Sequence, residues 1–169
     1  GCGRKLADEL GEDLSAVLMG SGVKDQAQEA IAFGADQAYV VDDPVLKDYN
    51  TDANVAAMEN VVKEAGPQIL LMGQTSLGRD LAPRLAFRLD TALGNDCIEL
   101  AIDPETRNLL QTRPVYGGNA RATSFTESRP QMATVRQKVM SALERDDSRQ
   151  GEIIILEAGV DPSQVRTKV

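Results

Sequence analysis

The apolar positions in the first half of the chain fall into two alternating patterns. Short continuous apolar runs are typical of buried strands, whereas apolar side chains that recur every three to four residues are typical of amphipathic helices. These patterns predict strands at 14–19, 38–41 and 68–72, each followed by a helix, at 24–33, 52–65 and 77–89. Because three strand and helix pairs follow one another, we expect a parallel sheet with right-handed crossovers and helices on both faces.

The chain opens on a further helical pattern that has no strand before it. Leu6 and Leu10 form one turn-spaced apolar stripe among charged residues, and Gly11 is the expected C-cap. An α/β unit ordinarily enters a helix from a strand. We therefore expect the first strand of the fold to be missing and residue 1 to be an artificial or processed start.

The second half of the chain is richer in short β-type segments. Runs separated by turn residues predict antiparallel or mixed strands at the edge of the sheet, at 98–102, 109–115, 120–127 and 132–136. A charge-dense surface loop at 141–151 precedes a last strand at 152–157. The predicted fold class is α/β, a three-layer Rossmann-like sandwich with a mainly parallel central sheet and a β-rich carboxyl-terminal part.

Composition narrows the class of protein. The 169 residues, 42% hydrophobic and 26% charged, suit one folded domain. A net charge of -8 would be repelled by nucleic acid and by anionic membranes, so neither is expected as a partner. No apolar run approaches the roughly 18 residues that span a bilayer, and no secretory signal is visible. We expect a cytoplasmic protein without membrane insertion.

The side chains that usually carry catalysis or electrons are scarce. There is no histidine, and Cys2 and Cys97 form no CxxC pair, which argues against zinc sites and cysteine–histidine nucleophiles. Two unpatterned cysteines also suit a reducing cytoplasm. The sequence has no tryptophan and only three tyrosines. We predict that the chain is not an enzyme and that any electron transfer must use a bound cofactor.

The glycines after the first predicted strand form half of a dinucleotide-binding motif. Gly20-Ser21-Gly22 would let a backbone approach a pyrophosphate, but the position of the third glycine holds Asp25. The negative charge of Asp25 would oppose a phosphate there. A structural turn is therefore favoured over a nucleotide site.

Polar residues open the helix that follows the third predicted strand. Gln74, Thr75 and Ser76 lie where free amides and the helix dipole favour an anion. The simpler interpretation is that Thr75 or Ser76 is the N-cap of the helix. The alternatives are the edge of a flavin or nucleotide site, or a contact with a partner subunit.

A glycine-rich turn joins two of the β-type segments. Gly117-Gly118-Asn119 is ordinary hairpin chemistry. Its neighbours Arg113 and Tyr116, together with Asn119, offer one fixed cation and several hydrogen bonds. Such a loop would suit a flavin ring or a protein interface as well as a purely structural turn.

Three long stretches resemble the alpha subunit of electron transfer flavoproteins. They are GADQAYVVDDPVLKDYN at 34–50, ILLMGQTSLGRDLAPRLAFRLDTALGNDCIEL at 69–100 and TRPVYGGNARATSFTESRPQMATVR at 112–136. The resemblance implies a heterodimer with a beta subunit that passes electrons from dehydrogenases to a membrane-bound acceptor such as a quinone reductase. In bifurcating members, it implies that the electrons of a reduced nicotinamide are divided.

The resemblance also implies where the cofactor lies. In this family the FAD of the alpha subunit sits mainly in a carboxyl-terminal domain, and we expect that domain to be absent from this sequence. We expect residues 1–159 to be the amino-terminal domain, similar to adenine nucleotide alpha hydrolases in fold, and 160–169 to begin a linker. The full complex would hold FAD, and this fragment would hold none stably.

Two departures from the family pattern affect the expected site. The usual Val-Arg-Pro-Gly is here Val135-Arg136-Gln137-Lys138, and Arg121 adds a charge beside the glycine turn. In bifurcating members, the resemblance implies that an arginine of this domain approaches the flavin of the beta subunit, where a cation stabilises the reduced ring. Arg113 is the first candidate and Arg136 the second.

Two other functions remain open at this point. A stand-alone adenine-nucleotide-binding module of the same α/β class would use the loops at 20–22 and 74–80. An ATP-cleaving ligase of related fold is disfavoured because the sequence has no Ser-Gly-Gly phosphate loop.

Overall fold

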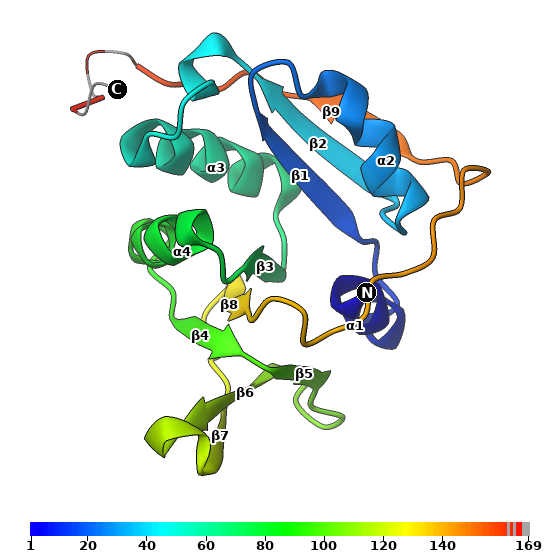
Figure 1. Ribbon diagram of the computed structural model, residues 1–169, viewed down its shortest axis with the longest axis vertical. Coiled ribbons are helices and arrows are strands. Elements are labelled where there is room, and N and C mark those ends of the chain that lie inside the picture. Colours follow the sequence, from blue (N-terminus) through cyan, green and yellow to red (C-terminus); the bar gives the residue numbers. More distant parts are fainter. Residues whose placement is uncertain (162, 164, 167–169) are drawn as a thin grey trace. The chain divides into compact units, whose positions relative to one another are not determined.

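The computed structural model describes residues 1–161, 163, 165 and 166 (Figure 1). Contacts within the chain divide it into two compact units. The first unit consists of Gly1–Glu12 and Gly66–Ser141, and the second consists of Asp13–Ala65 and the chain from Ala142 onward. Each unit therefore combines segments that are far apart in the sequence.

The second unit is built on a parallel sheet of three strands in the order β1-β2-β9. The strands are β1 (Ser15–Gly20), β2 (Gln37–Asp42) and β9 (Glu152–Ile155). The helical segments are η1 (Lys24–Gln26), α2 (Ala27–Ala32), η2 (Pro44–Leu46) and α3 (Thr51–Ala65). Apolar residues of α2 and β2 pack together in its core, among them Ile31 and Val40, which are fully buried.

The first unit contains a second parallel sheet, in the order β3-β8-β4. Its strands are β3 (Ile69–Gly73), β8 (Gln131–Val135) and β4 (Leu93–Cys97). Two α-helices belong to this unit, α1 (Cys2–Leu10) and α4 (Ser76–Arg88). The helix α1 ends at Gly11 in the left-handed conformation (φ 69°), as the sequence predicts for a C-cap glycine.

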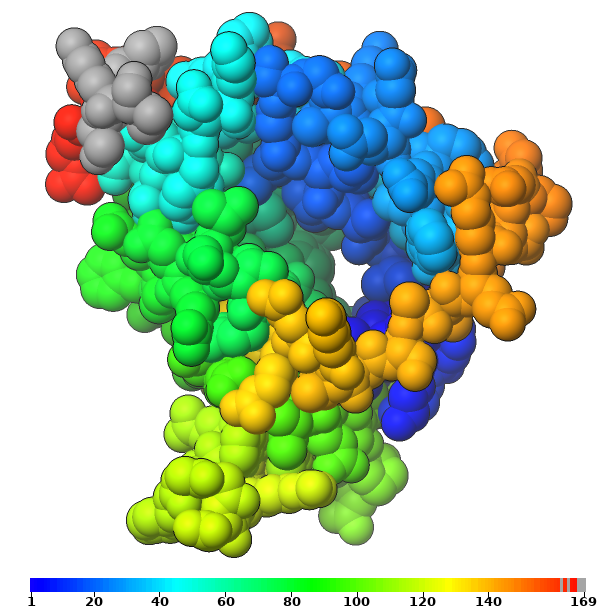
Figure 2. Space-filling model, viewed as in Figure 1, coloured from blue at the N-terminus to red at the C-terminus, as the bar shows by residue number. Residues whose placement is uncertain are grey.

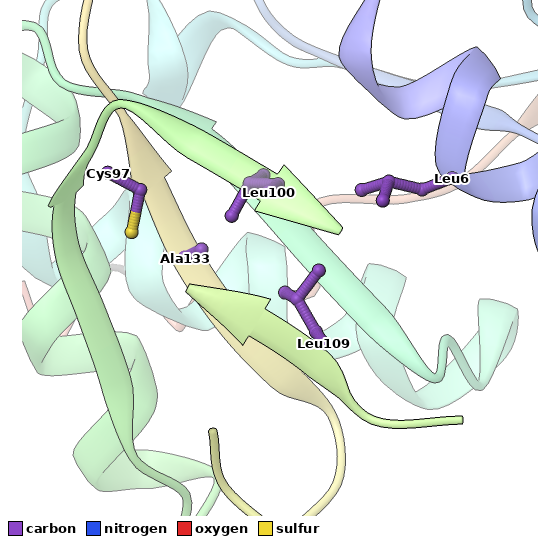
Figure 3. Packing of buried hydrophobic residues seen from close by; sticks show 5 residues of the cluster. All are labelled: Leu6, Cys97, Leu100, Leu109 and Ala133. Carbon is purple, nitrogen blue, oxygen red and sulfur yellow. The ribbon is translucent and has the colours of Figure 1, made fainter. Parts of the chain in front are cut away.

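An antiparallel sheet completes the first unit. Its strands are β5 (Glu99–Ile102), β6 (Leu109–Val115) and β7 (Ala120–Ser124), and the short helix η3 (Tyr116–Gly118) connects the last two. Five buried residues from different elements join this sheet to the parallel one, as Figure 3 shows. They are Leu6, Cys97, Leu100, Leu109 and Ala133.

The α/β fold class with parallel strands is confirmed, and the antiparallel segments lie where the sequence places them. One strand lies elsewhere than predicted: the segment at 132–136, expected among antiparallel or mixed strands at the edge of the sheet, is β8, the central strand of a parallel sheet. Met132 and Ala133 are 1% exposed, as expected for a central strand. The local pattern could not show this position, because the partners of β8 are β3 and β4, which lie far from it in the sequence. The strand β4 was not predicted at all.

Two further segments are shorter or less regular than the sequence suggests. The helix predicted at 24–33 is a 3₁₀ turn followed by a helix of six residues, and the strand predicted at 120–127 ends at Ser124. The expected linker at 160–169 lies partly outside the described residues.

Candidate functional site

The start of α4 is capped by Thr75. Its backbone is extended (φ -90°, ψ 175°), and its hydroxyl Oγ1 accepts a hydrogen bond from the Gly78 amide at 3.1 Å. The Arg79 amide donates to the Thr75 carbonyl at 2.9 Å. Ser76 is exposed, and its hydroxyl makes no hydrogen bond within the described part of the chain. Of the two caps that the sequence allowed, Thr75 is therefore the one present, and Ser76 is the first residue of the helix.

Gln74 lies at the carboxyl end of β3, next to the loop that follows β8. Its amide donates to the Val135 carbonyl at 2.7 Å, and its carbonyl accepts from Gln137 Nε2 at 3.2 Å. The side chain of Gln74 is buried, and its Oε1 has no hydrogen-bond partner among the described residues. Gln74 therefore ties β3 to the loop after β8 through its backbone.

Arg136 is held by a carboxylate at the same edge of the sheet. Its Nε and Nη2 donate to the two carboxylate oxygens of Asp96, at 3.0 and 2.6 Å. This hydrogen-bonded pair lowers the pKa of Asp96 and raises the pKa of Arg136. The charge of Arg136 is therefore balanced within the chain, which weakens its candidacy as a cation for flavin.

The predicted hairpin between β6 and β7 is present. Val115 pairs with Ala120, so four residues form its tip, and Figure 2 shows this segment in yellow-green as a protrusion. The side chain of Asn119 donates from Nδ2 to the Tyr116 carbonyl at 3.1 Å, whereas the Tyr116 side chain is 84% exposed. Arg113 is exposed on β6 and forms no ion pair within the described residues.

The predicted site residues thus fall into two groups. Gln74, Thr75, Ser76 and Arg136 share the carboxyl edge of the sheet β3-β8-β4. The second group, Arg113, Tyr116 and Asn119, belongs to the hairpin. Among the described residues, no hydrogen bond or ion pair joins the two groups.

The glycine turn at Gly20–Gly22 is already occupied by a side chain of the same unit. The Asp42 carboxylate accepts hydrogen bonds from the amides of Gly22 and Lys24, at 2.7 and 3.1 Å. These bonds lower the pKa of Asp42. The amides that a nucleotide phosphate would use at this turn are therefore engaged by the chain itself.

Sequence reasoning missed Asp96 and Asp42. Asp96 lies in β4, where the backbone has a positive φ of 59°, and only the pairing of β4 with β8 brings it to Arg136. Asp42 carried a usable signal, because an aspartate at the end of a strand, beside a strand that ends in a glycine turn, is well placed to bind free amides.

The cysteine thiols and the acidic side chains offer little redox or metal chemistry. Cys97 is fully buried, and burial raises the pKa of its thiol to about 11. Residues 1–161, 163, 165 and 166 contain no group of three cysteine, aspartate or glutamate side chains that could hold a metal ion. No helix in this part of the chain is long and apolar enough to cross a membrane.

The sequence of the chain was compared with models of known protein families. The model of the electron transfer flavoprotein domain matches residues 1–161. The chain belongs to this family. The resemblance seen in the sequence is thereby confirmed.

Individual relatives of this electron transfer flavoprotein domain agree with that assignment. The electron transfer flavoprotein subunit alpha of Thermoanaerobacterium thermosaccharolyticum is 48% identical over 98% of this chain and 50% of its own length. The subunit alpha of Megasphaera elsdenii is 42% identical over 99% of this chain and 50% of its own length. Protein FixB of Azorhizobium caulinodans is 44% identical over the whole chain and 47% of its own length. The chain spans about half the length of the curated relatives it matches.

Proposed function

We propose that the chain is the scaffold and interface domain of an electron transfer flavoprotein alpha subunit. In this role it supports FAD-mediated electron transfer together with the beta subunit and performs no chemistry of its own. The observation that carries the proposal is the match of residues 1–161 to the electron transfer flavoprotein domain, together with relatives that are named as alpha subunits. Dehydrogenases and a quinone reductase would reach this domain only through the complex.

The chemistry of the side chains supports a domain that assists electron transfer without carrying the electrons itself. The buried Cys97 thiol has a raised pKa, so it is a poor nucleophile and a poor redox group. Electrons must therefore be carried by a bound group, which FAD would supply. We expect the described residues to provide at most an edge of a flavin site, because their candidates lie in two groups and Arg136 is already paired with Asp96.

The β6–β7 hairpin is the best candidate for the contact with the beta subunit. Tyr116 is 84% exposed and Phe125 is 56% exposed, although large aromatic side chains usually lie buried. Arg113 in β6 and Arg121 in β7 are exposed as well and form no ion pair within the described residues. Tyrosine and arginine are the residues that most often dominate the energy of protein interfaces. The proposed partner surface therefore combines aromatic and cationic groups on one projecting element.

The test is the affinity of this chain for an electron transfer flavoprotein beta subunit, measured by analytical ultracentrifugation. The variant is Tyr116→Asn, because asparagine tolerates the positive φ of 50° at this position. We expect the dissociation constant to rise about 30-fold, as loss of about 2 kcal/mol at an interface hot spot would produce.

Phe87→Ala is the matched control. Phe87 in α4 is also 84% exposed and belongs to the same unit, but it lies outside the hairpin. Its substitution should leave the affinity unchanged. An unchanged affinity for Tyr116→Asn, or equal losses for the two variants, would rule out the hairpin as the contact. Failure of the natural chain to bind any beta subunit would contradict the proposed function itself.

A further inference from the structure

The turn after β1 has the geometry of an anion-binding loop. Gly22 has a φ of +75°, a conformation that favours glycine. A Cβ atom added at Gly20 would come within 2.7 Å of Cγ1 of Val23, so the turn is closely packed at Gly20, whereas the space beside Gly22 is open. The amides of Gly22 and Lys24 lie at this open side of the turn. Backbone amides in such a turn form concave sites for anions.

The anion in this loop is the Asp42 carboxylate. Gly20 and Asp42 are register partners at the carboxyl ends of the parallel strands β1 and β2. From there the Asp42 side chain reaches the turn, where Oδ1 accepts from the Gly22 amide and Oδ2 from the Lys24 amide. Each oxygen therefore has its own donor, as two oxygens of a bound phosphate would have. These hydrogen bonds to the charged carboxylate hold the pKa of Asp42 below its usual range.

We propose that Asp42 is a built-in anion that fills a phosphate-type site at Gly22–Lys24 and so closes this position to nucleotides. The inference goes beyond the proposed function and does not depend on it. In open α/β folds, ligands bind at the carboxyl ends of parallel strands, which is where this turn lies. A free phosphate would have to displace a carboxylate that the chain holds beside the amides at high effective concentration. The two negative charges would also repel each other.

The test compares phosphate binding to the natural chain and to Asp42→Ala. Inorganic phosphate and AMP are the two probes, and the readout is the NMR chemical shift of the amides of Gly22, Val23 and Lys24. In the natural chain we expect no shift with either probe. In Asp42→Ala both probes should cause saturable shifts confined to these amides, because the donors have lost their internal partner.

Asp25→Ala is the matched control, because it removes one carboxylate next to Lys24 without removing the partner of the amides. Asp25 is exposed and makes no hydrogen bond or ion pair within the described residues. This variant should not bind either probe. Binding by Asp25→Ala equal to that of Asp42→Ala would show a general charge effect and overturn the inference. Saturable shifts in the natural chain, or their absence in a folded Asp42→Ala chain, would also overturn it.

A titration of the natural chain provides a test that requires no substitution. The Gly22 and Lys24 amide resonances should move together as Asp42 takes up its proton, with a midpoint below the ordinary aspartate pKa of 3.8. If these two resonances do not respond to the protonation of Asp42, the carboxylate is not their partner and the inference fails.

Discussion

Replacing Gly78 by alanine gives a sharp test of the α4 start, because two effects of opposite sign compete. In an ordinary helix the change from glycine to alanine stabilises by about 0.5–1 kcal/mol. At Gly78, however, the new Cβ would lie closer than 3.0 Å to the Gly73 carbonyl oxygen, a separation that real Cβ atoms essentially never show. The carbonyl is a backbone group and the position of a Cβ atom is set by its own backbone, so no flexible side chain can move aside.

The size of the effect follows from these two terms. Overpacking costs about 1–3 kcal/mol, and the upper end applies here because the obstacle is a backbone carbonyl. Subtracting the helix gain of about 1 kcal/mol leaves a net loss of about 2 kcal/mol for the first unit. The substitution would also disturb the hydrogen bond from the Gly78 amide to Thr75 Oγ1. Every 1.4 kcal/mol corresponds to about a factor of ten, so the equilibrium constant for opening of the first unit should rise about 30-fold.

The Cys97 thiol reports on this opening directly. Cys97 is fully buried in the core of the first unit, so a thiol reagent reaches it only when the unit opens. In a Cys2→Ser background, Gly78→Ala should raise the rate of Cys97 labelling about 30-fold under conditions where closing outpaces reaction. Leu77→Ala, at a neighbouring position that is 52% exposed, should change the rate by no more than about twofold. Labelling of Gly78→Ala as slow as in the parent would refute the reasoning.

Two further substitutions test the core and the edge of the sheet. Leu109 is fully buried, so Leu109→Ala should lower the free energy of unfolding by about 2–5 kcal/mol in urea titrations; a loss below about 1 kcal/mol would contradict the packing in Figure 3. Arg136→Gln should destabilise the chain at neutral pH but not in acid. The folded pKa of Asp96 is lowered, so its contribution exists above the ordinary value of 3.8 and disappears as the pH falls through the folded pKa. Urea titrations across this range should therefore show the two chains converging at low pH, and a constant difference would contradict the role of the pair.

Continuous apolar runs made part of the fold predictable. The runs at 38–41 and 68–72 correspond to β2 and β3. A strand that is covered on both faces has apolar residues at successive positions, and this pattern distinguishes it from a surface element. The strand β4 could not be found in this way, since its residues include Gly94, Asn95 and Asp96, which disfavour strands. Tertiary packing explains Gly94, where a Cβ would collide with the side chain of Gln111.

The candidate site was predictable only as far as local chemistry determines it. The Thr75 cap and the hairpin at Tyr116–Asn119 depend on residues close in sequence, and both were identified. Arg136 and Asp96 are 40 residues apart in the sequence, so their ion pair could not be predicted from local patterns. The charge of an arginine that was expected to be available for flavin is instead balanced by an aspartate. The Asp42 contact with the glycine turn likewise depends on the register of β1 with β2.

The flavin content of the purified chain tests most directly whether this domain is a scaffold without a redox group of its own. The measurement is the visible flavin absorbance per mole of protein after gel filtration without added flavin. The account predicts far less than one flavin per chain, because the described residues do not converge on a flavin site and the cysteine in the core is inaccessible. One tightly held FAD per chain would contradict it.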